Sequence, residues 1–222
     1  MLVPGIDVSH YQGAIDWPQV AGGGVVFCFV KATEGIYVVD PFFKENWAGC
    51  AGAGLLRGAY HFGRPGTDAQ TQAQQFFSTV GTLGPHDLPP VLDIETLNQC
   101  SAEDALQWVL DFTAAADTLF GRRTMVYTDD GFWQNLVPIL AREPAAARSL
   151  AARPLWLADY VADPTVPSPW QAWSCWQYSD GSVNGATPVP GVAGDVDQNW
   201  FQQADLESLT SPLPPPQAQG SP

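Results

Sequence analysis

Short apolar runs alternate with more polar, helix-like segments along most of the chain, and several of the runs end in charged side chains. Their β-branched and aromatic content predicts eight short strands, at about residues 5–9, 25–35, 57–62, 89–96, 124–128, 155–160, 172–178 and 194–201. The alternation of strand-like and helix-like segments favours an α/β fold.

Capping residues mark the predicted helices, which lie mainly between the first strands. Helices are expected at about residues 40–54, 67–81, 101–121 and 130–152. In the first, Asp40 is placed as the N-cap and Pro41 at the first helical position. In the last, Pro138 and Pro144 are expected to interrupt the helix. The linkers between the last three strands leave no room for a full crossover helix or are rich in glycine and proline, so loops are expected there.

The run at residues 89–96 carries two carboxylates, Asp93 and Glu95, at its carboxyl end. Residues two apart on a strand share a face, with Cα atoms roughly 6–7 Å apart, so both acids are expected to point the same way while Ile94 points the other. Acids this close favour a shared proton or one raised pKa, which keeps a general acid protonated near neutral pH. The alternative interpretation is a plain strand end with solvated acids.

Asp7 lies in the first strand-like run, between Ile6 and Val8. A buried aspartate requires a polar partner, so Asp7 either forms a structural pair or faces a polar cavity at the end of the sheet. His10, in the following turn, is expected to be an ordinary hydrogen-bonding residue rather than a base. Lys31 is expected to pair with an acid rather than act as a nucleophile.

The composition is that of one sizeable domain with an acidic surface. The chain has 222 residues, of which 45% are hydrophobic, enough for a single core. Nine Lys and Arg against 23 Asp and Glu give a net charge of −14, which disfavours nucleic acid as a partner because phosphate binding needs clustered cations. No membrane span and no signal peptide are recognisable. Residues 1–210 are expected to form the domain and residues 211–222, rich in proline, a disordered tail or linker.

Cysteine and histidine do not form a metal-binding pattern, so no metal and no cofactor is expected. The chain has three His, and its four cysteines show no C-x-x-C spacing; they are Cys28, Cys50, Cys100 and Cys175. An even number of cysteines permits two disulfides or none, and Cys28 is expected to be buried within its apolar run.

Eight short motifs follow one another along about residues 4–205. They read G-I-D-V-S-H-Y-Q-G from Gly5, V-K-A-T-E-G from Val30, G-A-Y-H-F from Gly58, L-D-I-E from Leu92, V-Y-T from Val126, L-W-L-A-D-Y from Leu155, W-Q-Y from Trp176 and D-x-N-x-F from Asp197. Taken in this order, they resemble glycoside hydrolase family 25, the N-acetylmuramidase lysozymes of bacteria, phages and fungi. The resemblance implies an irregular, flattened TIM-like (β/α) barrel with eight strands and about five helices.

The resemblance also implies an activity and a place of action. A family 25 enzyme hydrolyses the β-1,4 bond between N-acetylmuramic acid and N-acetylglucosamine in bacterial peptidoglycan. The expectation is therefore a monomeric lysozyme that acts at the bacterial cell wall, either secreted or encoded by a phage as an endolysin.

On the matching positions, the resemblance implies Glu95 as the general acid, Asp93 as its catalytic partner, and Asp7 and Asp197 as further acids of one cleft. Barrel active sites lie at the carboxyl ends of the strands, where these acids would meet. Residues at strand ends are expected to bind the glycan, although core packing is the alternative for each aromatic one; they are Tyr60, Tyr127, Trp156, Asp159, Gln177 and Tyr178.

Two mechanisms remain open at this stage. A water activated by one carboxylate would invert the anomeric centre, whereas attack by the substrate's own 2-acetamido oxygen, with Asp93 steadying the amide nitrogen, would retain it. The D-x-E arrangement resembles that of substrate-assisted families and favours retention. Other classes are a catalytically inactive glycan-binding module of the same fold, a chitinase-like N-acetylhexosaminidase and a structural domain of a phage particle.

Overall fold

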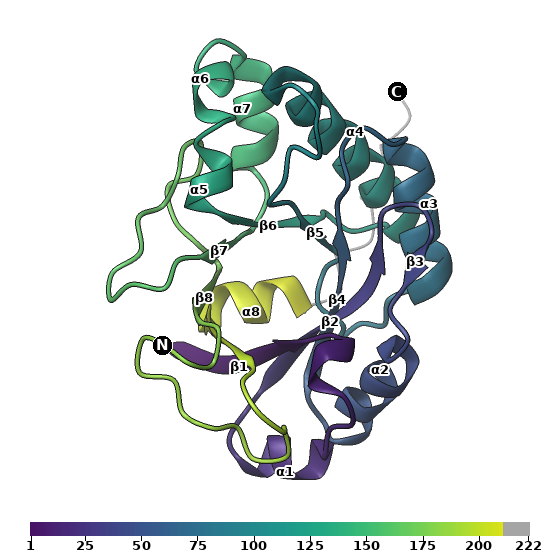
Figure 1. The fold of residues 1–222 in the computed structure, drawn as a ribbon, viewed down its shortest axis with the longest axis vertical. Helices are drawn as coiled ribbons and strands as arrows, with labels where there is room; N and C mark the ends of the chain where they lie inside the picture. Colours follow the sequence, from purple (N-terminus) through teal and green to yellow (C-terminus); the bar gives the residue numbers. More distant parts are fainter. Residues whose placement is uncertain (211–222) are drawn as a thin grey trace, which may run out of the picture.

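A closed barrel of strands organises the protein, whose computed structural model describes residues 1–210 (Figure 1). Its eight strands in this part of the chain are β1 (Leu2–Val8), β2 (Phe27–Glu34), β4 (Leu56–Phe62), β5 (Val91–Asp93), β6 (Met125–Asp129), β7 (Leu155–Ala158), β8 (Cys175–Ser179) and β9 (Asp197–Gln202). The pairing of β1 with β2 closes the ring. The predicted eight strands and α/β barrel are thus confirmed, and the two-residue strand β3 (Val38–Val39) pairs with β2 as an addition to the ring.

Strand direction is parallel around the ring except at β9. This strand runs antiparallel to both of its neighbours, β8 and β1. The connections at residues 159–174 and 180–196 contain no helix, which confirms the expected loops between the last three strands. Because β9 runs the other way, its first residue lies at the same mouth of the barrel as the carboxyl ends of the parallel strands.

Most of the helices pack against the outside of the barrel. Within residues 1–210, five helices have eight residues or more: α2 (Phe43–Gly52), α3 (Ala69–Val80), α4 (Ala102–Phe120), α7 (Pro144–Ala151) and α8 (Gln203–Thr210). Four shorter ones are η1 (His10–Gln12), α1 (Trp17–Gly22), α5 (Asp130–Trp133) and α6 (Val137–Leu140). Asp68 caps α3 and Ser101 caps α4, and the region of residues 130–152 is divided into separate helices, as its two prolines predicted.

The predicted start of α2 is wrong by two residues. The helix begins at Phe43, and Phe42 occupies the N-cap position without a side-chain hydrogen bond. Asp40 instead binds a distant part of the chain, since its Oδ2 accepts hydrogen bonds from the backbone N–H of His10 at 3.0 Å and from the His10 ring at 2.7 Å. This tertiary contact also confirms that His10 is a hydrogen-bonding residue.

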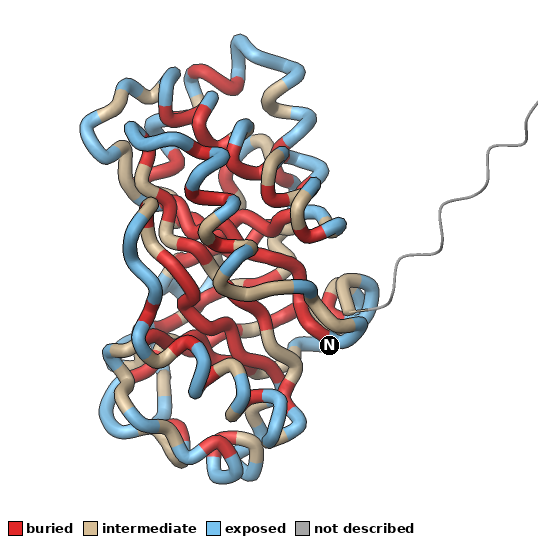
Figure 2. Tube along the Cα trace, turned by 90° about the vertical axis from the view of Figure 1, so that its right-hand side faces the viewer, coloured by how far each residue is buried: buried red, intermediate tan, exposed pale blue. Residues whose placement is uncertain are grey.

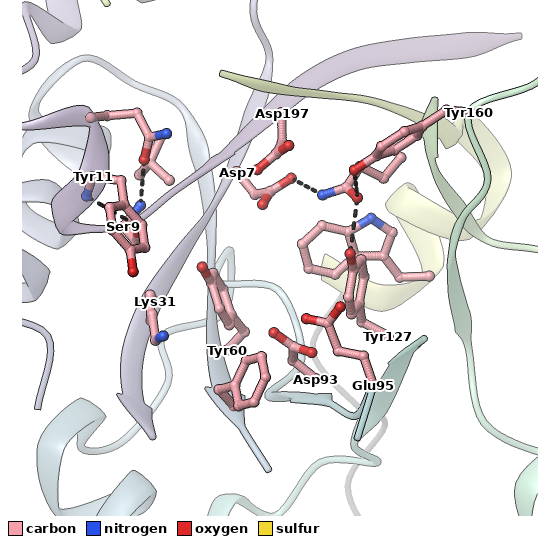
Figure 3. Close-up of a pocket in the computed structure, with 15 residues that line it drawn as sticks. Asp7, Ser9, Tyr11, Lys31, Tyr60, Asp93, Glu95, Tyr127, Tyr160 and Asp197 are labelled. Carbon is pink, nitrogen blue, oxygen red and sulfur yellow. Dashed lines mark hydrogen bonds between the residues drawn. The ribbon is translucent and has the colours of Figure 1, made fainter. Parts of the chain in front are cut away.

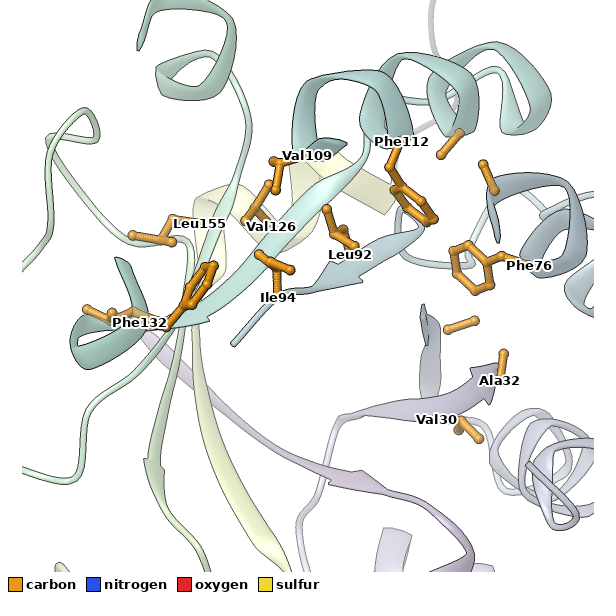
Figure 4. Close-up of a cluster of buried hydrophobic side chains, with 14 of the residues drawn as sticks. Val30, Ala32, Phe76, Leu92, Ile94, Val109, Phe112, Val126, Phe132 and Leu155 are labelled. Carbon is orange, nitrogen blue, oxygen red and sulfur yellow. The ribbon is translucent and has the colours of Figure 1, made fainter. Parts of the chain in front are cut away.

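Two apolar layers stabilise the fold, one outside the barrel wall and one inside it. The outer layer packs Leu92 and Ile94 of the β5 region against Phe112 of α4 (Figure 4). The inner layer is aromatic, with Phe29 stacked on Trp156 at a centroid distance of 4.4 Å. Each such ring contributes on the order of 2 kcal/mol on burial. In Figure 2 the buried residues gather in the middle of the molecule, with exposed segments around its edges.

Helix α8 seals the amino-terminal mouth of the barrel. Leu206 and Leu209 of this helix belong to the inner layer together with Val3, Leu56 and Leu88, which lie near the amino ends of their strands or just before them. Since this mouth is filled with apolar side chains, the opposite mouth is the one available for polar chemistry.

The structure settles two further points raised by the sequence. Cys28, Cys50, Cys100 and Cys175 are all free thiols, and Cys28 is buried as expected. In the described part of the chain, no helix combines the length and the apolar character that crossing a bilayer requires. The tail predicted at residues 211–222 lies outside the described residues.

Candidate active site

A cavity of about 300 Å³ opens at the carboxyl-terminal mouth of the barrel. All four predicted acids line it, with Asp7 and Asp197 on one side and Asp93 and Glu95 on the other (Figure 3). Asp7 comes from β1, Asp93 ends β5, and Asp197 begins the antiparallel strand β9. The topology therefore brings together acids that are far apart in the sequence.

The extended backbone continues past the end of β5 and turns Glu95 into the cavity. Ile94 donates its N–H to the carbonyl oxygen of Tyr127 at 3.0 Å, as in a strand, although the strand formally ends at Asp93. Ile94 is fully buried in the outer apolar layer, whereas Asp93 and Glu95 both face the cavity. As predicted, Asp93 and Glu95 share one face of the extended segment and Ile94 lies on the other.

Asp93 and Glu95 form a hydrogen-bonded pair that retains a proton near neutral pH. Burial is the main cause that raises the pKa of Asp93 well above its usual value, and the charge of Glu95 raises it further. Burial also raises the pKa of Glu95, although its hydrogen bond with Asp93 acts in the opposite direction. The Oδ1 atom of Asp93 is buried without a hydrogen-bond partner. The resting proton therefore lies on Asp93, one hydrogen bond away from Glu95.

Asp7 and Asp197 form a second pair across the β1–β9 ladder, where they are direct partners in register. Burial, followed by the charge of Asp7, raises the pKa of Asp197 to about 9. Burial also raises the pKa of Asp7, to about 6, with hydrogen bonds from Asn199 and Gln177 limiting the change. At neutral pH this pair contains one carboxylate, on Asp7, and one neutral acid, on Asp197.

Four of the six residues predicted to bind the glycan line this cavity: Tyr60, Tyr127, Trp156 and Gln177. Trp156 and Tyr127 also belong to the inner apolar layer and pack edge to face at 4.6 Å. Asp159 lines an adjoining hollow of about 300 Å³, which shares Glu95, Tyr127 and Tyr160 with the main cavity. The two hollows thus meet at Glu95.

Tyr178 does not lie in the cleft, which corrects the expectation from the sequence. Neighbouring residues on a strand face opposite sides, and because Gln177 of β8 points into the barrel, Tyr178 points out of it. There its ring stacks on Trp200 at 5.6 Å, and its hydroxyl donates to Gln198 at 2.7 Å.

Seven residues that line the cavity were not predicted as site residues: Val8, Ser9, Tyr11, Gln12, Lys31, Phe62 and Tyr160. The Nζ atom of Lys31 lies 2.8 Å from Glu34, which confirms its expected pairing with an acid. Tyr160 ends the motif L-W-L-A-D-Y, and Lys31 is the second residue of V-K-A-T-E-G, so both motifs contained a signal. Tyr11 is 82% exposed at the rim of the cavity.

The arrangement is suited to acid–base chemistry on a neutral polymer. Two proton-sharing acid pairs face each other across a cavity walled by aromatic rings, and such pairs supply both an acid and a carboxylate at one pH. Among residues 1–210, no group of three or more His, Cys, Asp or Glu is arranged to hold a metal ion.

Comparison with known proteins identifies a matching family, a relative of similar sequence and solved structures of similar fold. A profile described as "Glycosyl hydrolases family 25" matches residues 6–186. Lysozyme M1 of Streptomyces globisporus is 37% identical over 210 residues, which cover 90% of this chain and 67% of that protein. A bacterial lysozyme from Streptomyces coelicolor superposes with a TM-score of 0.83 at 37% identity, covering 94% of this chain and 96% of that one. A GH25 lysozyme from Aspergillus fumigatus gives 0.80 at 29% identity, covering 96% and 100%.

Proposed function

The chain belongs to glycosyl hydrolase family 25 and is a glycoside hydrolase of peptidoglycan, and from this premise we propose that it is an N-acetylmuramidase with Glu95 as its general acid. It would cleave the β-1,4 bond between N-acetylmuramic acid and N-acetylglucosamine at the bacterial cell wall. The observation that carries the proposal is the hydrogen-bonded Asp93–Glu95 pair, in which Asp93 is buried and the more exposed Glu95 lies where the two hollows meet.

Glu95 is better placed than Asp93 to deliver the proton. It lines both hollows, so a glycosidic oxygen that joins a sugar in one hollow to a sugar in the other would lie beside its carboxyl group. Asp93 is 5% exposed and belongs to one hollow only. The hydrogen bond between the two lets the resting proton pass from Asp93 to Glu95, which leaves Asp93 as a carboxylate when the acid is ready to act.

The same contact supports retention through the substrate's own acetamido group. An inverting pair needs its carboxyl groups about 6.5–9.5 Å apart to admit a water molecule, and two carboxyls joined by a hydrogen bond leave no such space. Asp93, once ionised, can accept the N–H of the 2-acetamido group and direct its oxygen to the anomeric carbon. Asp7, ionised across the cavity, adds negative charge where the transition state becomes positive.

The remaining parts of the proposal concern the chain as a whole. Residues 1–210 would form the catalytic domain, with residues 211–222 as a tail or linker. One chain supplies all four acids, which supports action as a monomer. Tyr60 and Tyr127 would contact the bound sugars, and Asp159 would contact the sugar in the adjoining hollow. Trp156, which is 1% exposed, would support the cavity wall behind them.

The test is digestion of purified peptidoglycan by wild type and by Glu95→Gln, followed by mass analysis of the released muropeptides. New reducing ends at muramic acid that disappear in Glu95→Gln support the proposal. Glu103→Gln is the matched control, since Glu103 is exposed on α4 and, within residues 1–210, forms an ion pair with the exposed Arg142.

Two outcomes would contradict the proposal. Binding without cleavage by the wild type would favour the inactive glycan-binding module. Reducing ends that form at glucosamine would indicate an N-acetylglucosaminidase instead. The anomer that NMR detects first in the products decides between retention and inversion.

A further inference from the structure

The carboxamide of Gln177 forms hydrogen bonds inside the protein through both its oxygen and its nitrogen. Its Oε1 accepts the hydroxyls of Tyr127 at 2.9 Å and Tyr160 at 3.0 Å, and its Nε2 donates to Oδ2 of Asp7 at 3.0 Å. A carbonyl oxygen has two lone pairs, so Oε1 has no capacity left for a sugar hydroxyl. With 3% of its surface exposed, Gln177 is poorly suited to contact substrate.

A second amide, from Asn199 on β9, converges on the same oxygen of Asp7. Its Nδ2 donates to Oδ2 of Asp7 at 2.7 Å, and its Oδ1 accepts the indole N–H of Trp156 at 2.7 Å. An indole nitrogen can only donate, so Trp156 determines which end of the amide faces Asp7. The hydroxyls of Tyr127 and Tyr160 donate to Oε1 of Gln177, which leaves its Nε2 facing Asp7.

The two members of the Asp7–Asp197 pair therefore have different surroundings. Asp7 receives two amide N–H groups on one oxygen, whereas within residues 1–210 Asp197 has Asp7 as its hydrogen-bond partner and no amide donor. Hydrogen bonds from amides stabilise a carboxylate over its protonated form. The negative charge of the pair is thereby held on Asp7.

We propose that Gln177 and Asn199 are positioning residues that fix the charge of the pair on Asp7 and leave its proton on Asp197. The pair would then present a single carboxylate to the sugar. This inference rests on the proposed function for its catalytic consequence, since an oriented carboxylate stabilises an oxocarbenium-like transition state.

Other titratable groups face Asp7 from several elements and do not substitute for the two amides. On the cavity side these are Asp93, Glu95, Tyr60, Tyr127 and Tyr160, with the Asp197 carboxyl on β9 and the cation of Lys31 at the far end. Burial raises the pKa of each of the three phenols, so all three stay neutral donors. Burial likewise raises the pKa of the neighbouring thiols of Cys28 and Cys175.

The test is the pH dependence of kcat in Gln177→Glu and Asn199→Asp. Each variant keeps the shape and the acceptor oxygen but can donate to Asp7 only when its new carboxyl is protonated. We expect the alkaline limb of the kcat profile to move down by at least about one pH unit in both, equivalent to a tenfold loss at neutral pH, with KM within about twofold of wild type. Gln107→Glu, exposed on α4, is the matched control and should keep the wild-type profile.

A uniform fall in kcat without a change of profile would overturn the proposal, and so would an effect confined to KM, which would make Gln177 a substrate contact. Should either variant fail to fold, the half-exposed Tyr160 offers Tyr160→Phe, which removes one of the two hydroxyls that orient Gln177. Titration of 13C-labelled aspartate carboxyls by NMR supplies a readout without substrate, in which Gln177→Met should raise the Asp7 midpoint. An inactive wild type would refute the proposed function, while the NMR titration would still decide the role of Gln177.

Discussion

Replacing Asp197 by asparagine is expected to stabilise the protein at neutral pH. Burial raises the pKa of Asp197 from 3.8 to about 9, so at pH 7 the unfolded chain has an ionised carboxylate where the folded protein has a neutral acid. An asparagine is neutral in both states, and its Nδ2 can donate to Asp7 as the protonated acid does. The substitution therefore removes a proton-uptake cost from folding.

The size of the gain follows from the pKa values and depends on pH. Because the folded pKa is raised, stability is fully present below about pH 4 and is lost as pH rises toward 9, at about 1.4 kcal/mol per unit. Over the roughly three units between 3.8 and 7 this amounts to about 4 kcal/mol. Because Asp7 and Asp197 share one proton, part of this cost belongs to the pair and not to Asp197 alone. We therefore expect Asp197→Asn to raise the free energy of unfolding by about 2–4 kcal/mol at pH 7, or the Tm by about 5–15 °C for a domain of this size.

Urea unfolding of wild type and Asp197→Asn at several pH values between 4 and 8 measures this difference. The gain should be near zero at pH 4 and grow steadily with pH. Asp163→Asn, at an exposed loop position, serves as the control and should change stability by the same small amount at every pH. A difference that does not vary with pH, or a loss of stability at pH 7, would refute the reasoning.

Three further predictions follow from the site and the core. Tyr60→Phe should lower kcat/KM on peptidoglycan by about tenfold, the effect of losing one hydrogen bond from the Tyr60 hydroxyl to a bound sugar. Tyr178→Phe should leave kcat/KM within about twofold of wild type. Equal effects of the two substitutions would contradict the placement of Tyr60 inside the barrel and Tyr178 outside it. Burial lowers the pKa of His61 from 6.5 to about 4. The stabilisation that the neutral His61 gives to the folded protein is therefore complete above pH 6.5 and is lost as pH falls towards 4. The destabilisation of His61→Gln in urea should then shrink by up to about 3 kcal/mol between pH 7 and pH 4, and a constant difference would argue against a neutral histidine. Gly49→Ala should destabilise by about 1–3 kcal/mol because its Cβ would meet an indole ring at 2.0 Å, while Gly52→Ala, with open space on the same helix, should not; thermal melting of the two variants checks this.

Local patterns in the sequence were enough to predict an α/β fold with eight strands and the Asp93–Glu95 geometry, whereas the barrel was an implication of the family resemblance. Strand alternation has a period of two, so acids two apart must share a face, and Ile94 between them must be buried. The same rule could have excluded Tyr178 from the cleft, since Gln177 and Tyr178 are neighbours and cannot both face inward.

Contacts between distant segments were not accessible in the same way. Asp40 has the local sequence of an N-cap, but the structure directs its carboxylate to His10, thirty residues earlier. The pairing of Asp7 with Asp197 depends on β9 running antiparallel between β8 and β1, and no local pattern specifies strand direction. The roles of Gln177 and Asn199 depend in turn on that pairing.

The closing of the barrel by β1 makes the site sensitive to the order in which the chain folds. Asp7 lies on the first strand and Asp197 on the last, and β1 pairs with both β2 and β9. Joining segments so far apart carries a loop-closure entropy that local helix packing does not, so this ladder is expected to form late. On the ribosome, a nascent chain would hold folded helices before it had a complete acid quartet. Enzymatic activity would then report the last step of folding, and fraying of the β1–β9 ladder would abolish activity while most of the helical signal remained.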